Sequence, residues 1–130
     1  MKTFYFRKLV RDKVLQRCLD DPQIKTFHYT LSPEEYHDEL IKKLHEEVDE
    51  IDTAVLDEDL LSEIADVQEV LDAIAELHGF TKEVIQDAQD AKNHKNGAFI
   101  DRAYIEKVEL DDDSEWVSIL RQQPEKYEEV

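Results

Sequence analysis

The sequence predicts an all-α fold, an antiparallel bundle of about four helices, and two observations lead to this. Only two glycines and three prolines occur in 130 residues, so the segments that interrupt helices are few. Apolar residues between positions 40 and 77 recur every three or four positions, which places them along one face of a helix. Helices of this kind bury their apolar faces against one another, hence the expected bundle.

The first two helices can be located from their ends. A helix is expected from Lys13 to Asp20, because a proline follows Asp21 and disfavours helical backbone in the residue before it. The next helix is expected to start at Ser32, whose hydroxyl can cap it and form a capping box with Glu35. Its apolar stripe runs through residues 40–55.

Two further helices are expected after residue 56. The acidic run 57–59 favours a helix N-terminus, because carboxylates stabilise the positive end of the helix dipole. Gly79 suits the end of that helix, and Thr81 can cap a fourth helix that ends near Gly97. The connection between the third and fourth helices is therefore short.

The C-terminal part is expected to differ from the bundle. Residues 103–110 and 116–121 are candidates for short strands, and the segment 111–130 is expected to be an acidic extension. Residues 1–110 would then form the functional domain.

The charge distribution is uneven. The formal net charge is −17, which argues against nucleic acid as a partner because phosphate backbones attract positive charge. Residues 1–30 carry +4, whereas residues 34–76 carry −15. A solvated helical surface would explain these charges. Alternatively, the acids gather cations while the basic segments hold an anion.

The sequence also gives expectations about location. Basic residues interrupt the apolar letters near the N-terminus, so no signal peptide is expected, and no apolar run is long enough to cross a membrane. Cys18 is the only cysteine, so no intrachain disulfide can form. We therefore expect a cytoplasmic protein that does not associate with membranes.

Two pairs of carboxylates stand out on consecutive predicted helices. Glu47 and Glu50 form one pair and Glu63 and Asp66 the other, each spaced by three residues and so on one side of its helix. At about 100° per residue, Glu63 falls inside the apolar stripe of its own helix. A carboxylate directed into a core needs a cation, and oxygen ligands of this type suit Mg²⁺ or Mn²⁺. A buried salt bridge from Glu63 to Lys43 is the alternative.

In these residues the sequence resembles the MazG-like all-α nucleotide pyrophosphohydrolases, in particular the branch of phosphoribosyl-ATP pyrophosphohydrolase. Five features in chain order carry the resemblance, which extends from about residue 8 to 108. They are the stretch Lys8-Leu9-Val10-Arg11-Asp12-Lys13, the triplet Glu34-Glu35-Tyr36, Lys43 with the segment Glu46-Glu47-Val48-Asp49-Glu50, the pair Glu63 and Asp66, and the lysine-rich turn 92–99, where Ala98 replaces a glycine of the family pattern.

The resemblance implies a helical homo-oligomer, at least a dimer, that binds Mg²⁺ through Glu47, Glu50, Glu63 and Asp66. It implies hydrolysis of nucleoside triphosphates or related nucleotides to the monophosphate and pyrophosphate, by attack of water at the α-phosphorus. Glu46 and Lys43 are the expected catalytic residues. The cations expected to bind the phosphates are Arg11, Lys13, Lys92 and Lys95.

Two other functions remain open at this point. The chain could be a non-catalytic metal-binding regulatory module of the same fold, although a degenerate relative should have lost at least one of the five acids. It could also be phosphoribosyl-ATP pyrophosphohydrolase of histidine biosynthesis. The basic N-terminal stretch and the acidic tail fit a small house-cleaning enzyme better than that enzyme.

Overall fold

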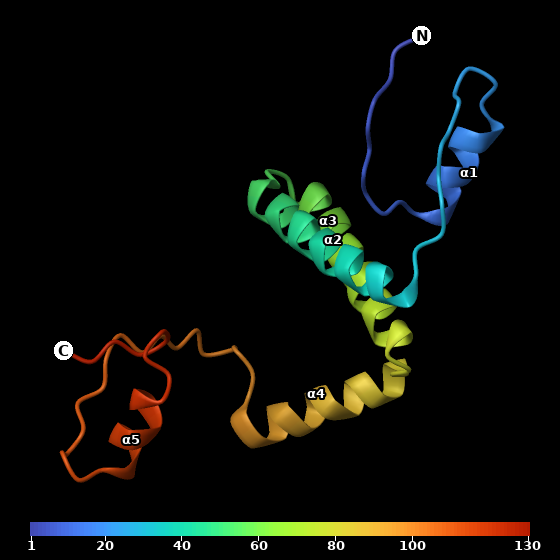
Figure 1. Cartoon of the computed structure of the whole chain (residues 1–130). Coiled ribbons are helices and arrows are strands. Elements are labelled where there is room, and N and C mark those ends of the chain that lie inside the picture. Colours follow the sequence, from blue (N-terminus) through green and yellow to red (C-terminus); the bar gives the residue numbers. More distant parts are fainter. The chain divides into compact units, whose positions relative to one another are not determined.

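The computed structural model describes residues 1–130 and contains five helices and no strand (Figure 1). The chain divides into two compact units, Met1–Lys95 and Asn96–Val130. The first unit contains α1 to most of α4, and the second contains α5. The expectation of a helical protein is therefore confirmed. The proposed domain boundary at residue 110 stays a prediction.

Helix α1 spans Asp12–Asp20 and helix α2 spans Pro33–Thr53. The capping box predicted at the start of α2 is present: the Ser32 side chain accepts a hydrogen bond from the Glu35 amide at 3.2 Å, and the Glu35 carboxylate accepts one from the Ser32 amide at 3.3 Å. These two bonds satisfy amides that would otherwise lack partners at the helix end.

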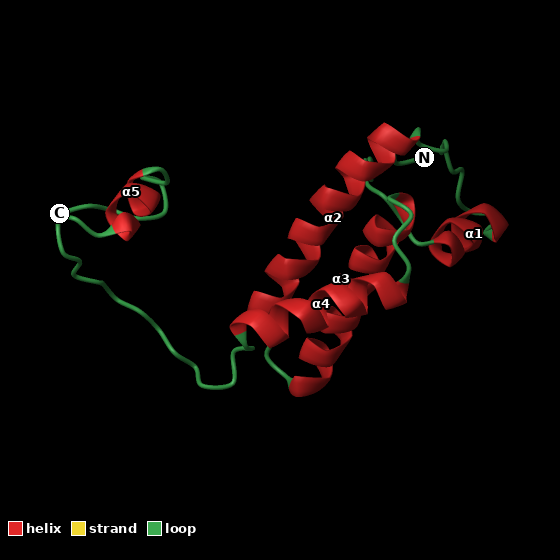
Figure 2. Cartoon of the chain, turned by 90° about the horizontal axis from the view of Figure 1, so that it is seen from below, coloured by secondary structure: helices red, strands yellow, loops and turns green.

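Helix α3, Asp57–Leu77, packs beside α2 to form a helical hairpin (Figure 2). A connection of three residues joins the two helices, so they run in opposite directions. The small core of this hairpin contains Leu40 from α2 and Val70 from α3, the two buried hydrophobic side chains of the chain. The hairpin is the scaffold on which the predicted acid pairs lie.

Helix α4 spans Lys82–Asn96 and begins as the sequence predicts. Gly79 has a φ of +77°, a left-handed conformation that glycine adopts easily, and the Thr81 hydroxyl accepts a hydrogen bond from the Val84 amide at 3.2 Å. Helix packing is confined to α2 and α3, so the predicted four-helix antiparallel bundle is not confirmed.

The prediction of short strands near the C-terminus is wrong. Residues 115–121 form helix α5, Glu115–Arg121, and residues 103–110 have no regular secondary structure. The Ser114 hydroxyl accepts a hydrogen bond from the Trp116 amide at 3.3 Å, which caps the helix. This local cap decides the conformation of a short segment whose apolar residues also suit a strand.

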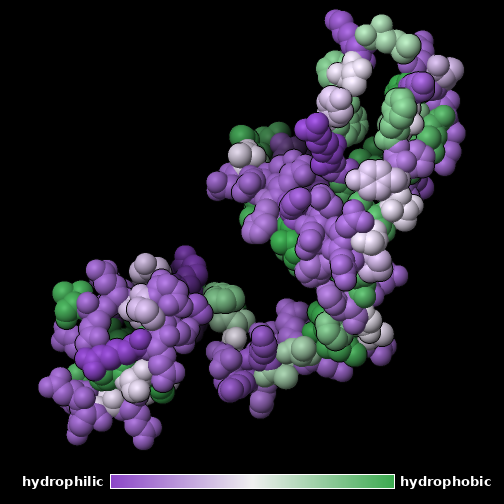
Figure 3. Space-filling model, in the orientation of Figure 1, coloured by the Kyte–Doolittle hydropathy of each residue, from purple (hydrophilic) through white to green (hydrophobic).

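Many large hydrophobic side chains lie at the surface. Figure 3 shows such side chains at the turn between α3 and α4, where Phe80, Val84 and Ile85 are exposed. None of the five helices combines the length and the apolar character that a membrane crossing requires.

Candidate metal site on the α2–α3 hairpin

Three of the predicted carboxylates meet between α2 and α3. One carboxylate oxygen each from Glu47, Glu50 and Glu63 lies within 4.8 Å of the other two. The spacing of three residues places Glu47 and Glu50 on one side of α2, and the hairpin brings that side against Glu63 on α3. The hairpin thus creates a cluster of hard oxygen ligands, which we call the acid cluster.

The acid cluster is partly buried, and a cation could bind there. Glu47 is only 7% exposed, and its Oε2 atom is buried without a hydrogen-bond partner. The Oε2 atom of Glu63 is also buried and unpartnered. A buried carboxylate oxygen without a partner is costly, and a divalent cation bound to oxygen ligands would remove that cost. These residues therefore fit Mg²⁺ or Mn²⁺.

The pKa values of two carboxyl groups in the acid cluster are raised. A hydrogen bond with Glu50, loss of solvent and the charges of Glu50, Asp66 and Glu47 raise the pKa of Glu63 from 4.5 to about 7. Loss of solvent also raises the pKa of Glu47, against the opposing effect of Lys43. Carboxylates crowded in this way hold a proton where a metal ion could take its place.

Lys43 is the cation on α2 closest to the acid cluster. Its Nζ atom lies 3.4 Å from Oε1 of Glu47 and 3.5 Å from Oε1 of Glu46. The alternative considered for Glu63, an ion pair with Lys43, is not found. Lys43 therefore compensates the two adjacent acids of its own helix.

Asp66 has a different partner from the other three predicted ligands. Its Oδ1 atom accepts a hydrogen bond from Arg11 at 2.6 Å, and Asp66 is not one of the three acids that converge within 4.8 Å. Its charge nevertheless contributes to the raised pKa of both Glu63 and Glu47. Asp66 thus lies at the edge of the acid cluster, held by a cation from the N-terminal segment.

The N-terminal segment supplies a second cation that was not expected at the acids. Lys8 Nζ lies 4.0 Å from Oε1 of Glu46. The sequence places Lys8 in the basic stretch 8–13, but neither periodicity nor spacing relates that stretch to residues on α2. Only the large charge difference between residues 1–30 and 34–76 signals that the two segments could attract each other.

The other predicted phosphate ligands do not lie at the acid cluster. Lys13 is exposed on α1, and Lys92 and Lys95 are exposed on α4, and none of the three forms an ion pair. Neither α1 nor α4 packs against the hairpin helices. Lys82 at the start of α4 pairs with Asp72 of α3 at 3.8 Å, whereas Arg11 and Lys8 are the cations from outside the hairpin that pair with the predicted site acids Asp66 and Glu46.

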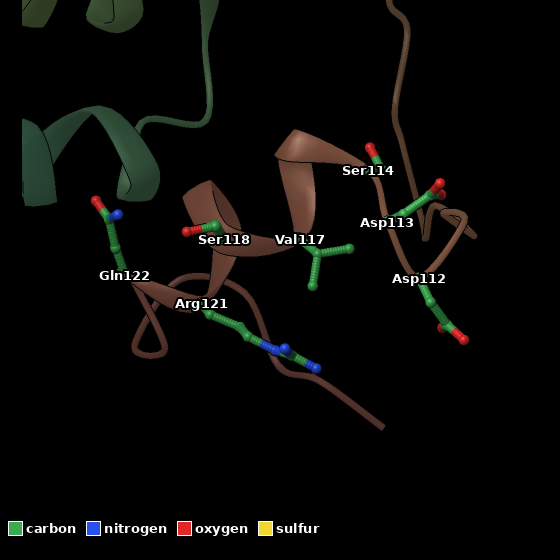
Figure 4. A pocket seen from close by; sticks show the side chains of 7 residues that line it. All are labelled: Asp112, Asp113, Ser114, Val117, Ser118, Arg121 and Gln122. Atoms are coloured by element: carbon green, nitrogen blue, oxygen red, sulfur yellow. The ribbon is translucent and has the colours of Figure 1, made fainter.

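Two surface hollows accompany these features. One borders the acid cluster at the loop end of the hairpin and is lined by Glu50, Thr53, Ala54, Val55, Asp59 and Glu63. The other lies in the Asn96–Val130 unit around Asp112, Asp113, Ser114, Val117, Ser118, Arg121 and Gln122 (Figure 4). Arg121 in the second hollow is already paired with Glu129, its Nε lying 2.7 Å from a carboxylate oxygen. The first hollow is thus the one that adjoins unsatisfied acids.

Comparison with known proteins adds no relative to this picture. No protein-family model, no curated protein and no solved structure matches the chain. The acid cluster and the cations beside it are therefore the features that bear on the chemistry of the site.

Proposed function

We propose that the chain hydrolyses nucleoside triphosphates, or closely related nucleotides, to the monophosphate and pyrophosphate, using Mg²⁺ bound through Glu47, Glu50, Glu63 and Asp66. The observation that carries the proposal is the convergence of three acids within 4.8 Å, two of them with buried oxygens that lack partners. The resemblance of these residues to MazG-like pyrophosphohydrolases supplies the choice of reaction.

The residues around the acid cluster would have different roles in the proposed reaction. A bound Mg²⁺ would neutralise phosphate charge and lower the pKa of a water molecule. Glu46, more exposed than Glu47, would accept the proton that the attacking water loses. Lys43, which bridges Glu46 and Glu47, would hold both carboxylates in position. The three side chains that converge are all carboxylates, and the single cysteine, Cys18, lies on α1, so direct attack by water is expected.

The proposed reaction forms one bond and breaks another at the α-phosphorus. The water oxygen bonds to that phosphorus, the bond to the oxygen bridging towards the β-phosphorus breaks, and pyrophosphate leaves. The outer phosphates need positive charge, and Arg11 from the N-terminal region would supply part of it. Lys13 was expected to do the same, but it lies exposed on α1 away from the acid cluster. Lys92 and Lys95 would have to come from a second copy of the chain or from a movement of α4.

The test is a panel of nucleotides with Mg²⁺: canonical, deoxy and damaged triphosphates together with phosphoribosyl-ATP. Products are scored for pyrophosphate against inorganic phosphate, and active substrates are hydrolysed in ¹⁸O-labelled water. We expect the label in the monophosphate and none in pyrophosphate. Label in inorganic phosphate, with a diphosphate as co-product, would mean attack at the γ-phosphorus and would refute the proposal.

A non-catalytic metal-binding module of the same fold is the second candidate. One observation favours it: Arg11 holds Asp66, so only three of the four proposed ligands converge. Such a module would bind Mg²⁺ at the same acids but would release no product from any member of the panel. Turnover of phosphoribosyl-ATP alone would instead indicate the enzyme of histidine biosynthesis.

A further inference from the structure

The N-terminal segment places two cations on the acids that border the acid cluster. Arg11 hydrogen-bonds to Asp66 on α3 across a separation of 55 residues, and Lys8 lies 4.0 Å from Glu46 on α2. Both contacts join a segment outside the hairpin to acids on its two helices. Neither cation reaches the three acids at the centre.

The backbone of Arg11 is held by hydrogen bonds, whereas its side chain is largely exposed to solvent. Its carbonyl oxygen accepts hydrogen bonds from the amides of Val14 at 3.0 Å and Leu15 at 3.2 Å, which anchors it at the start of α1. Its side chain is 57% exposed. The guanidinium group can therefore change partner by rotation about its own bonds while α1 stays in place.

Charge around the acid cluster makes a change of partner favourable once a metal ion binds. Five acids (Glu46, Glu47, Glu50, Glu63 and Asp66) face three cations (Lys8, Arg11 and Lys43), which leaves a net charge of −2 when all are ionised. One divalent ion balances that charge. Its field would repel the guanidinium of Arg11 and compete with it for Asp66.

A triphosphate offers the released cations a better partner. A guanidinium group pairs in a bidentate manner with phosphate oxygens, and an ammonium group binds them as a point charge. Phosphate chains bound near the acid cluster would place several such oxygens within reach of a segment that already borders it.

We propose that Arg11, assisted by Lys8, exchanges partners. In the metal-free protein Arg11 pairs with Asp66 and Lys8 with Glu46, and in the metal complex both cations pair with the outer phosphates of the substrate. This inference rests on the proposed function, because it requires a divalent ion at the acid cluster. It predicts opposite effects of Arg11 on two ligands, hindering the metal ion and favouring the phosphate chain.

The test uses the full chain and two separate binding measurements. Mn²⁺ binding is followed by electron paramagnetic resonance without any phosphate, and binding of inorganic tripolyphosphate is followed by calorimetry in saturating Mg²⁺. The variant is Arg11→Gln. The matched control is Arg17→Gln, because Arg17 lies exposed on the same helix and forms no ion pair with these acids. Circular dichroism verifies that both variants retain their helices.

Arg11→Gln is expected to bind Mn²⁺ about threefold to tenfold more tightly than the unaltered chain, since one competing charge is gone. It is expected to bind tripolyphosphate at least about tenfold more weakly, since a charge-assisted pair is lost. Arg17→Gln should change neither constant. Weaker binding of both ligands, or unchanged binding of both, would overturn the exchange while leaving the metal site intact. An unaltered chain that binds no Mn²⁺ would instead overturn the proposed function and the exchange with it.

Discussion

Lys43 holds one oxygen of the Glu47 carboxylate at 3.4 Å, while the other oxygen of the same carboxylate is buried without any partner. One oxygen of this carboxylate is therefore compensated within the chain, and the other has no hydrogen-bond partner. The relationship makes Lys43 a stabilising residue of the metal-free protein as well as a proposed catalytic one.

Replacing Lys43 with methionine should destabilise the metal-free protein by about 1–3 kcal/mol, because Glu47 loses its cation while it stays buried. Saturating Mg²⁺ should recover much of that loss. Lys42→Met is the control, because Lys42 pairs with Glu39 at the surface, where ion pairs contribute little. Urea unfolding measures both variants, and equal effects of the two would contradict the assigned role.

The free energy of unfolding should depend on pH through the ionisation of Glu63. Its pKa is raised from 4.5 to about 7, so between these values the folded metal-free protein binds more protons than the unfolded chain. Stability from this group is therefore present at low pH and is lost as pH rises towards about 7. The raised pKa of Glu47 acts in the same direction. Urea unfolding between about pH 5 and pH 8 should show a shallower fall for Glu63→Gln than for the unaltered chain.

Binding of the metal ion should release protons for the same reason. Below about pH 7 part of the Glu63 population carries a proton that the ion must displace. Calorimetric titration with Mg²⁺ in buffers of different ionisation enthalpy counts these protons. Proton release should be absent above about pH 8, and a pH-independent count would argue that Glu63 is not a ligand.

Substitution of Glu63 by glutamine should separate stability from function. The variant should retain its helices and, without metal at neutral pH, be at least as stable as the unaltered chain, because the repulsion among the acids falls. It should lose Mg²⁺ affinity and all turnover. Glu69→Gln, an exposed position on the same helix, serves as the control. Full activity of Glu63→Gln would eliminate the metal assignment.

The local features of the fold were predictable because neighbouring residues determine them. The Ser32–Glu35 capping box, the left-handed Gly79 and the Thr81 cap are all found where the sequence predicts them. Helical spacing and a short connection predict that the two acid pairs meet. Glu47, Glu50 and Glu63 do converge, whereas the fourth predicted ligand, Asp66, is not one of the converging acids. Short-range information was sufficient for each of these features.

Contacts between distant segments were not predictable in this way. Arg11 meets Asp66 across 55 residues, and no periodicity encodes that pairing. Residues 116–121 are a candidate for a short strand from sequence, whereas in the structure the hydroxyl of Ser114 caps a helix there. A segment of six residues is too short for its hydrophobic periodicity to distinguish a helix from a strand, so the Ser114 cap determines that it is helical.

The exposed apolar side chains predict self-association. On α3, the apolar side chains of Leu61, Ile64 and Leu71 are 70%, 49% and 44% exposed, so the hairpin leaves apolar surface uncovered. We expect a symmetric homo-oligomer, at least a dimer, whose contacts cover helix faces of the hairpin. Ile64→Glu, at an exposed apolar position on α3, should reduce the mass measured by light scattering. A monomer mass for the unaltered chain across micromolar concentrations would contradict this expectation.

The three-residue connection between α2 and α3 has a kinetic consequence. Glu50 and Glu63 are near each other in the chain, so closing the hairpin orders few residues and requires no distant partner. Elements with such local contacts form on the microsecond scale, well before contacts such as Arg11 with Asp66 are needed. A chain still emerging from the ribosome could therefore bring the acid cluster together as soon as residue 77 is free.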